Sequence, residues 1–306
     1  MGRFRHKSAL LVFAAFAGVF AIALTAQTTF KVDVKLVRLL VTVKDGKGEL
    51  VGSLERPDFT VYDSGVKQDV AVFEHHTAWP LSVALLVDTS GSTAKDLRYE
   101  TVSIEKFLQA LLREGNPDDA VALFAFNDQV TRLNWFTRRE QQLIDSLKAL
   151  KAEAGTSLYD AIHLASRDLT GRDGRHVIVA VSDGGDTTSS KKYADAFQSA
   201  QNADAIVYPI LVMPITNDAG RNLGGERVLE TLASGTGGRV FQPAGATELD
   251  AAFTQILRDL RTQYLVGYYP RNIPSEAPPF HPVKVELGRK DLRVTTRTGY
   301  YGDAAR

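Results

Sequence analysis

A carboxylate and two hydroxyl groups follow the first strongly apolar run of this chain. Asp88, Ser90 and Ser92 come directly after the apolar residues 81–87, at every second position. A buried strand that ends in this way directs several hard oxygen atoms to one point. Such atoms suit a small divalent cation such as Mg²⁺, with coordination positions left for water or for a partner's ligand. Taken alone, the pattern is also typical of turns and helix caps.

Two further segments supply the same kinds of oxygen atom. Thr156 lies in a Gly-Thr-Ser loop before a predicted helix that starts at Leu158, and Asp183 follows the apolar run 177–181. Either residue by itself could serve only as a helix cap or as part of a turn. Together the segments predict an oxygen cage with an open position, made of Asp88, Ser90, Ser92, Thr156 and Asp183. Asp186 could hydrogen-bond a water or hydroxyl ligand of the cation, or it could be a solvated acid of a turn.

The elements between these segments predict the fold that would bring them together. Four nearly continuous apolar runs are typical of parallel strands covered on both faces, and amphipathic helical patterns lie between them. The runs are residues 81–87, 120–126, 176–181 and 206–212. We therefore expect a doubly wound α/β domain over residues 80–268, with a mostly parallel sheet and helices on both faces. Loops beyond the carboxyl ends of such strands share one edge, where open α/β sheets bind ligands.

Both flanks of this domain have β patterns. Residues 30–76 contain alternating apolar positions, residues 269–281 form a proline-rich loop, and residues 282–301 contain two more β patterns. Neither flank is long enough to bury a core alone. We expect the two flanks to pair into one small β module beside the α/β domain.

The N-terminus resembles a secretory signal. Basic residues precede an apolar run over residues 9–24, and Thr25-Ala26-Gln27 follows it. This pattern predicts a signal peptide over residues 1–26, with cleavage after Ala26 and export to the periplasm or the extracellular space. The alternative is an uncleaved N-terminal membrane anchor, although an apolar run of about 16 residues is short for a span of about 20.

Composition excludes several other classes of function. The chain has no cysteine, so disulfides, thiolate metal sites and cysteine nucleophiles are absent from it. Its 36 basic and 36 acidic residues balance, so no net charge draws it to nucleic acid. The pair His75-His76 has no third ligand at a useful spacing, which favours a hinge or surface position over a metal site.

The three oxygen-bearing segments resemble the metal-ion-dependent adhesion site of von Willebrand factor type A domains. Residues 88–92, Thr156 and Asp183 match its three parts in order, and the resemblance covers about residues 80–268. Residues 39–45, 58–62 and 264–270 also resemble a group of exported bacterial proteins related to this family. The resemblance implies that Ser90, Ser92 and Thr156 are hydroxyl ligands, and that Asp88 and Asp183 bind the cation directly or through water. In the family, a carboxylate from a protein partner fills the open position.

The sequence therefore predicts an exported, metal-dependent protein-binding module for adhesion or scaffolding. Its cation would be Mg²⁺, with Ca²⁺ or Mn²⁺ as alternatives, and its partner would present Asp or Glu. The loops around the site would set specificity: residues 127–137, which include Asn127 and Asp128, and residues 214–226. The alternative is a hydrolase that uses the same cation as a Lewis acid. No histidine lies near the three segments and Asp186 is their only spare carboxylate, so we expect no enzyme.

Overall fold

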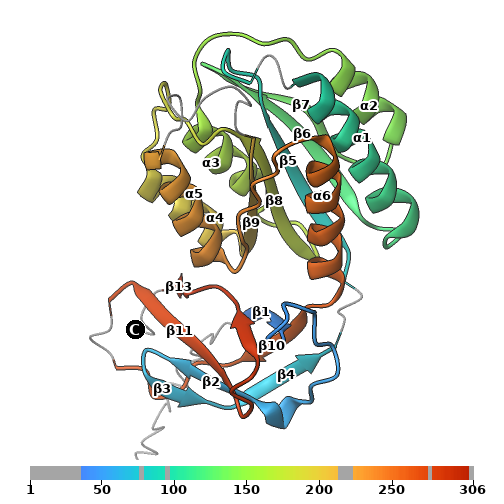
Figure 1. Ribbon diagram of the computed structural model, residues 1–306. Coiled ribbons are helices and arrows are strands. Elements are labelled where there is room, and N and C mark those ends of the chain that lie inside the picture. The colour runs from blue at the N-terminus through green and yellow to red at the C-terminus, as the bar shows by residue number, and fades with distance from the viewer. Residues whose placement is uncertain (1–35, 76–78, 94–96, 213–222, 275–277, 303–306) are drawn as a thin grey trace, which may run out of the picture. The chain divides into compact units, whose positions relative to one another are not determined.

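A five-stranded sheet forms the centre of the α/β domain in the computed structural model (Figure 1). The structure describes residues 36–75, 79–93, 97–212, 223–274 and 278–302, so the predicted signal peptide lies outside it. The strands are, in sheet order, β7 (Val130–Thr137), β6 (Ala120–Phe126), β5 (Leu81–Asp88), β8 (Arg175–Ser182) and β9 (Ala205–Leu211). All neighbours are parallel except β7, which runs antiparallel to β6. The predicted mostly parallel α/β sheet is confirmed.

Helices cover both faces of this sheet, because alternate residues of each strand point to opposite sides. Val83 and Leu85 belong to a core with α1 (Leu97–Glu114), α2 (Glu140–Lys148) and α6 (Ala246–Arg261). Ala84 and Leu86 belong to a second core with α3 (Leu158–Leu169), α4 (Tyr193–Asn202) and α5 (Leu223–Thr236). Figure 1 shows these two groups of helices on either side of the strands. Every residue of β5, β6, β8 and β9 is buried, which explains their continuous apolar sequences.

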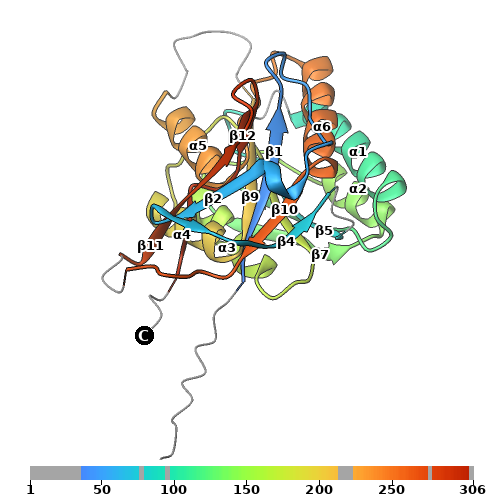
Figure 2. The same cartoon turned by 90° about the horizontal axis from the view of Figure 1, so that it is seen from below.

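The flanking strands form two four-stranded sheets, which we call the β module (Figure 2). One sheet has the order β12 (Arg293–Thr295), β1 (Val37–Lys44), β10 (Tyr264–Tyr268) and β4 (Val70–Glu74). The other has the order β13 (Gly299–Tyr301), β11 (Phe280–Leu287), β2 (Phe59–Asp63) and β3 (Val66–Gln68). A short 3-10 helix (Arg56–Asp58) precedes β2. Both sheets contribute to one apolar core. Each sheet thus joins strands from the N-terminal and the C-terminal flank.

Two boundaries differ from those expected. Strand β10, placed by the sequence in the α/β domain, pairs antiparallel with β1 and β4 of the β module. Its five residues are all buried, so its composition resembles that of a parallel core strand. Residues 127–137, expected to be a loop, include the edge strand β7. The sequence did not indicate this strand, because β7 lies at the edge of the sheet and carries polar side chains, and most of its residues are half-buried or exposed.

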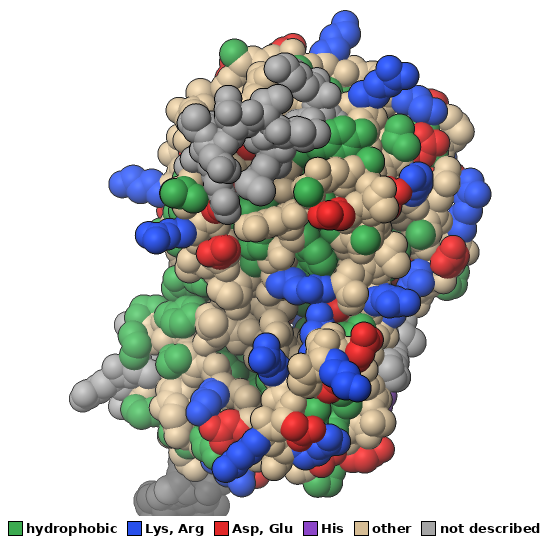
Figure 3. Space-filling model, viewed as in Figure 1, with side chains coloured by type: hydrophobic (Ala, Val, Ile, Leu, Met, Phe, Trp, Pro, Cys, Tyr) green, Lys and Arg blue, Asp and Glu red, His purple; other side chains and the backbone are tan. Residues whose placement is uncertain are grey.

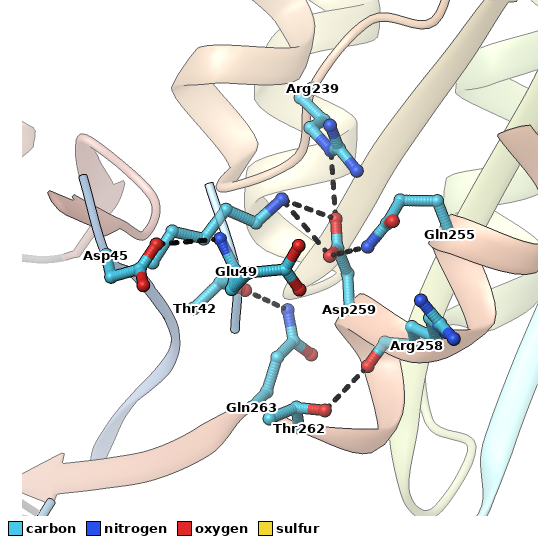
Figure 4. A network of polar contacts seen from close by, with 10 residues as sticks. Thr42, Asp45, Glu49, Arg239, Gln255, Arg258, Asp259, Thr262 and Gln263 are labelled. Carbon is cyan, nitrogen blue, oxygen red and sulfur yellow. Dashed lines mark hydrogen bonds and ion pairs between the residues drawn. The ribbon is translucent and has the colours of Figure 1, made fainter. Parts of the chain in front are cut away.

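Ion pairs connect the β module to the α/β domain. Asp259 of α6 is buried and lies 3.3 Å from Lys44 Nζ and 2.9 Å from Arg239 Nε. Gln255 Nε2 also donates to it, at 3.0 Å (Figure 4). A second aspartate, Asp204, has a left-handed backbone with φ of 51°.

None of the helices in the described part of the chain has both the length and the apolar content that a membrane span requires.

Candidate functional site

Asp88 is the last residue of β5 and is completely buried. Its Oδ2 accepts a hydrogen bond of 2.5 Å from Ser182 Oγ, and its Oδ1 accepts one of 2.8 Å from the backbone N–H of Ser90. Burial and, to a smaller extent, the nearby carboxylate of Asp183 raise the pKa of Asp88 to about 6, although these hydrogen bonds lower it. A positive charge at this position would therefore stabilise the ionised carboxylate.

The turn after β5 brings the two serine hydroxyl groups together. Ser90 Oγ and Ser92 Oγ lie 3.0 Å apart. The turn is fixed by Thr93, whose Oγ1 donates to the carbonyl oxygens of Asp88 and Ser90, each at 3.0 Å. The predicted hydroxyl ligands thus lie on the same short segment as the buried carboxylate.

The segment that carries Thr156 is attached to this turn through the backbone. Glu153 N–H donates to the carbonyl of Thr89 at 2.8 Å, and Ser90 and Glu153 form an isolated parallel bridge. Gly155 has a φ of 83°, and a Cβ at this position would lie 2.7 Å from the Cβ of Asp128. Only glycine fits here, because both the backbone conformation and the space exclude a side chain.

Thr156 itself is buried and joins the second segment to the third. Its backbone N–H donates to Thr187 Oγ1 at 3.0 Å, and its carbonyl accepts the N–H of Thr187 at 2.8 Å and that of Thr188 at 3.1 Å. The next residue, Ser157, lies 2.8 Å from Thr188 through the two hydroxyl oxygens. The loop before α3 is therefore held against the loop after β8.

Asp183 and Asp186 have different positions in that loop. Asp183 is half-buried directly after β8, and its Oδ1 accepts the N–H of Gly185 at 3.0 Å. Asp186 Oδ1 accepts from Ser189 Oγ at 2.6 Å and from the N–H of Tyr159 at 3.1 Å. Tyr159 is in the first turn of α3, where backbone N–H groups have no partner within the helix. Asp186 is thus a hydrogen-bonded acid that positions the start of α3, and its hydrogen bonds are to Ser189 and Tyr159, neither of which is a predicted ligand.

The five predicted ligand residues come from three segments that contact one another at the carboxyl edge of the sheet. They offer two carboxylates and three hydroxyl groups, a donor set of hard oxygens that fits Mg²⁺ or another small divalent cation. Within the described ranges, no group of three His, Cys, Asp or Glu side chains could hold a metal. The five residues do not conflict with this finding, because only two of them are acids.

Asn127 and Asp128 lie in the turn between β6 and β7, beside this site. Asn127 Nδ2 donates to Glu153 at 3.3 Å, and Asp128 N–H donates to the carbonyl of Ala154 at 3.1 Å. Glu153 is an exposed acid close to the site that the sequence analysis missed. Residues 214–222 of the other predicted specificity loop lie outside the described residues; Leu223–Glu226 begin α5.

Ser182 was also missed, although it is buried and donates to Asp88. Its hydroxyl accepts the N–H of Gly184 at 3.1 Å as well. The signal in the sequence was a hydroxyl residue at the end of an otherwise apolar strand, directly before Asp183. Ser182 therefore connects the first predicted segment to the third.

A family model described as von Willebrand factor type A domain matches residues 83–185, which include all three segments. This part of the α/β domain is therefore similar to a von Willebrand factor type A domain. No curated protein matches the chain.

Several solved structures align with this chain at low sequence identity. The pilus adhesin SpaC from Lactobacillus rhamnosus GG, in its open conformation, aligns with a TM-score of 0.51 and 11% identity, over 86% of this chain and 41% of that one. The von Willebrand domain of the type V pilus tip protein Mfa5 from Porphyromonas gingivalis gives 0.49 and 16%, over 60% and 95%. The conserved hypothetical protein BatB from Bacteroides thetaiotaomicron gives 0.48 and 18%, over 59% and 98%.

Proposed function

We propose that this protein is an exported, metal-dependent binding module that captures an acidic side chain of a partner protein. The observation that carries the proposal is the fully buried carboxylate of Asp88 beside a second acid, Asp183, and the paired hydroxyls of Ser90 and Ser92. Burying charge without compensation is costly. A divalent cation would offset the charge of these two acids.

The same electrostatics favour an acidic partner. Two carboxylates balance the charge of one divalent cation, and hydroxyl groups add neutral oxygen ligands without further charge. A cation held in this way keeps Lewis acidity for one more anionic ligand. A partner's Asp or Glu would lose water on binding, and its contact with the cation would offset that cost.

Binding is favoured over catalysis by the residues around the site. Hydrolysis by a metal usually requires a general base within hydrogen-bond reach of the attacking water. His176 lies at the start of β8, the opposite end of the strand from Ser182. Asp186 is engaged with the first turn of α3. Glu153 is exposed and contacts Asn127, which suits a role at the rim of a binding surface.

An extracellular or periplasmic location is part of the proposal. It rests on the basic and apolar N-terminus of the sequence. The similar fold of SpaC, a pilus adhesin, supports a protein-interaction role outside the cell. The face in Figure 3 carries acidic and basic side chains side by side, as expected for a protein that binds through a local site.

Calorimetry tests the metal site directly. We expect Mg²⁺ to bind the wild-type chain with one site and Asp88→Ala to lose that binding. Asp118→Ala is the matched control, because Asp118 is exposed and precedes β6 at the opposite edge of the sheet. Equal Mg²⁺ binding by wild type and Asp88→Ala would refute the site.

Partner capture tests the function. Immobilised protein should retain specific extracellular proteins from the native organism with Mg²⁺ present and release them with a chelator. Asp88→Ala should retain none of them, whereas Asp118→Ala should behave as wild type. Capture of the same proteins by wild type in chelator would exclude the metal-bridged contact.

A further inference from the structure

A pocket lined by three arginines lies at the edge of the sheet opposite to the candidate metal site. Arg175 is the first residue of β8, whereas Ser182 at the other end of that strand contacts Asp88. Seven residue steps of about 3.3 Å place the two ends roughly 23 Å apart. The pocket has an empty volume of about 550 Å³, including its open mouth. It is therefore separate from the proposed cation and partner contact.

The buried guanidinium of Arg175 lines this pocket and has no acidic hydrogen-bond partner among the described residues. Its side chain donates to the carbonyl of Trp79 at 3.3 Å and to that of Leu260. No ion pair joins it to a carboxylate within the described part of the chain. Burial lowers the pKa of the Arg175 guanidinium to about 10, and Asp119 offsets this only in part. A buried cation of this kind is stabilised by an anion.

The other two arginines come from the β module and share a single acid. Arg38 Nη2 lies 3.2 Å from Asp204 Oδ2, and Arg297 Nη1 lies 2.5 Å from Asp204 Oδ1. Three guanidinium groups against one carboxylate leave an excess of two positive charges among the arginine and aspartate side chains of the lining. One carboxylate of a ligand would reduce this excess and could accept two parallel N–H bonds from one arginine.

Two buried polar atoms of the lining lack a hydrogen-bond partner among the described residues: Arg297 Nε and Gln201 Oε1. Both side chains are more than nine-tenths buried. Gln201 Nε2 donates to the carbonyl of Gly235 at 2.6 Å, which fixes the orientation of the amide. The free Oε1 must therefore accept a hydrogen bond, whereas Arg297 Nε must donate one. A ligand with both an acceptor and a donor would satisfy both atoms.

The remaining lining is largely apolar. Leu40 and Leu265 of the β module and Ile206 of β9 line the pocket together with Trp79. The guanidinium of Arg38 lies 5.6 Å from the ring centroid of Trp79. A pocket with apolar walls and a few fixed polar groups is typical of sites for small organic molecules.

We propose that this pocket binds a small organic carboxylate that also carries a hydroxyl or amino group next to the carboxylate. The carboxylate pairs with the arginines, the neighbouring donor bonds to Gln201 Oε1, and the carbon skeleton packs against the apolar walls. The β module supplies Arg38 and Arg297, whereas the α/β domain supplies Arg175 and Gln201. A bound ligand therefore contacts both the β module and the α/β domain and stabilises the folded chain.

Titration calorimetry and thermal unfolding with mandelate, an aromatic α-hydroxycarboxylate, test this proposal on the full chain. All measurements are made in EDTA, so that a carboxylate cannot bind through a divalent cation at Asp88. Phenylacetate lacks the hydroxyl group, mandelamide lacks the charge, and inorganic phosphate lacks the carbon skeleton. We expect mandelate to bind with a Kd below about 1 mM and to raise the Tm, phenylacetate to bind several-fold more weakly, and mandelamide and phosphate not to bind.

Arg38→Gln and Arg297→Gln should each weaken mandelate binding by about tenfold or more. Arg38 is half-exposed, so this variant should fold even if Arg297→Gln does not. Arg293→Gln is the matched control, because it removes the same charge from an exposed residue of β12 outside the pocket. Asp88→Ala should bind mandelate as wild type does. Four outcomes would each overturn the proposal. The first two are that folded wild type does not bind mandelate, or that it binds mandelamide or phosphate as tightly as mandelate. The other two are that Arg38→Gln binds mandelate as wild type does, or that Asp88→Ala loses mandelate binding.

Discussion

The hydroxyl of Ser182 donates a hydrogen bond of 2.5 Å to the buried carboxylate of Asp88. The two residues end neighbouring parallel strands, β8 and β5. The bond connects two of the three segments of the candidate metal site at its most buried point. It also means that the carboxylate has one fixed orientation before any cation binds, which reduces the entropy that binding would otherwise cost.

Ser182→Ala should therefore destabilise the fold. It leaves one oxygen of Asp88 buried without its donor and also removes the acceptor of the Gly184 N–H. We expect a loss of about 1–3 kcal/mol in the free energy of unfolding, measured by urea denaturation with EDTA present. Ser234→Ala is the control, since Ser234 is exposed on α5 and its loss should cost less than about 0.5 kcal/mol. Equal stability of the two variants would contradict the role of Ser182.

Asp88→Asn should separate metal binding from folding. Asparagine keeps the shape of Asp88 and can still accept the N–H of Ser90, while the Ser182 hydroxyl can turn to accept from its amide. The substitution removes a buried negative charge, so unfolding in EDTA should cost as much free energy as in wild type or more. The Mg²⁺ affinity should fall by at least about tenfold, because a neutral amide replaces a carboxylate ligand.

Mg²⁺ itself should stabilise wild type but not Asp88→Asn. A ligand present at about 100 times its Kd adds roughly 2.7 kcal/mol to the stability of the folded state. Thermal unfolding of both proteins with Mg²⁺ and with EDTA measures this difference. An equal response of the two proteins would show that Mg²⁺ acts elsewhere on the chain.

Gly155→Ala should displace the loop that carries Thr156. The new Cβ would lie 2.7 Å from the Cβ of Asp128, at a residue with a φ of 83°. Gly171→Ala is a close control, because Gly171 has a φ of 84° and no atom within 4 Å of a Cβ. The control should lose only the cost of the backbone conformation, about 1 kcal/mol, and should bind Mg²⁺ normally. Gly155→Ala should lose more stability than Gly171→Ala in urea denaturation and should also bind Mg²⁺ more weakly. If the two variants lose the same stability and bind Mg²⁺ equally well, the loop accommodates the new Cβ without an effect on the site.

The fold of the α/β domain could be predicted from the sequence because its strands are buried on both faces. That burial requires continuous apolar runs such as 81–87 and 176–181, and these stand out from the helical patterns between them. Strand β10 has the same composition for a different reason: it lies inside a sheet of the β module. The apolar composition of a strand indicates that it is buried but not which strand lies next to it. The sequence therefore predicted β10 to belong to the α/β domain, whereas it lies in a sheet of the β module.

The candidate site was predictable to a lesser degree. Asp88, Ser90 and Ser92 are close in sequence, so their spacing predicted their proximity. The contacts that connect the segments involve groups with no such signal, namely the Ser182 hydroxyl and the backbone of Thr156. The arginine-lined pocket could not be predicted, since Arg38, Arg175 and Arg297 are distant in sequence and meet only when the β module packs on the α/β domain.

Asp259→Asn tests how strongly the β module is joined to the α/β domain. The Asp259 side chain is 3% exposed and pairs with Lys44 and Arg239 (Figure 4). Its neutralisation leaves Lys44, which is 18% exposed, and Arg239, which is 40% exposed, without their acid, and this should cost about 1.5–3 kcal/mol of unfolding free energy. Asp250→Asn on the same helix removes an ion pair with Lys106 whose acid is 32% exposed, and it should cost less than about 1 kcal/mol. Urea denaturation of both variants gives the comparison. If Asp259→Asn costs no more than Asp250→Asn, the ion pair of Asp259 with Lys44 of β1 does not hold the two parts together, and packing between them must do so instead.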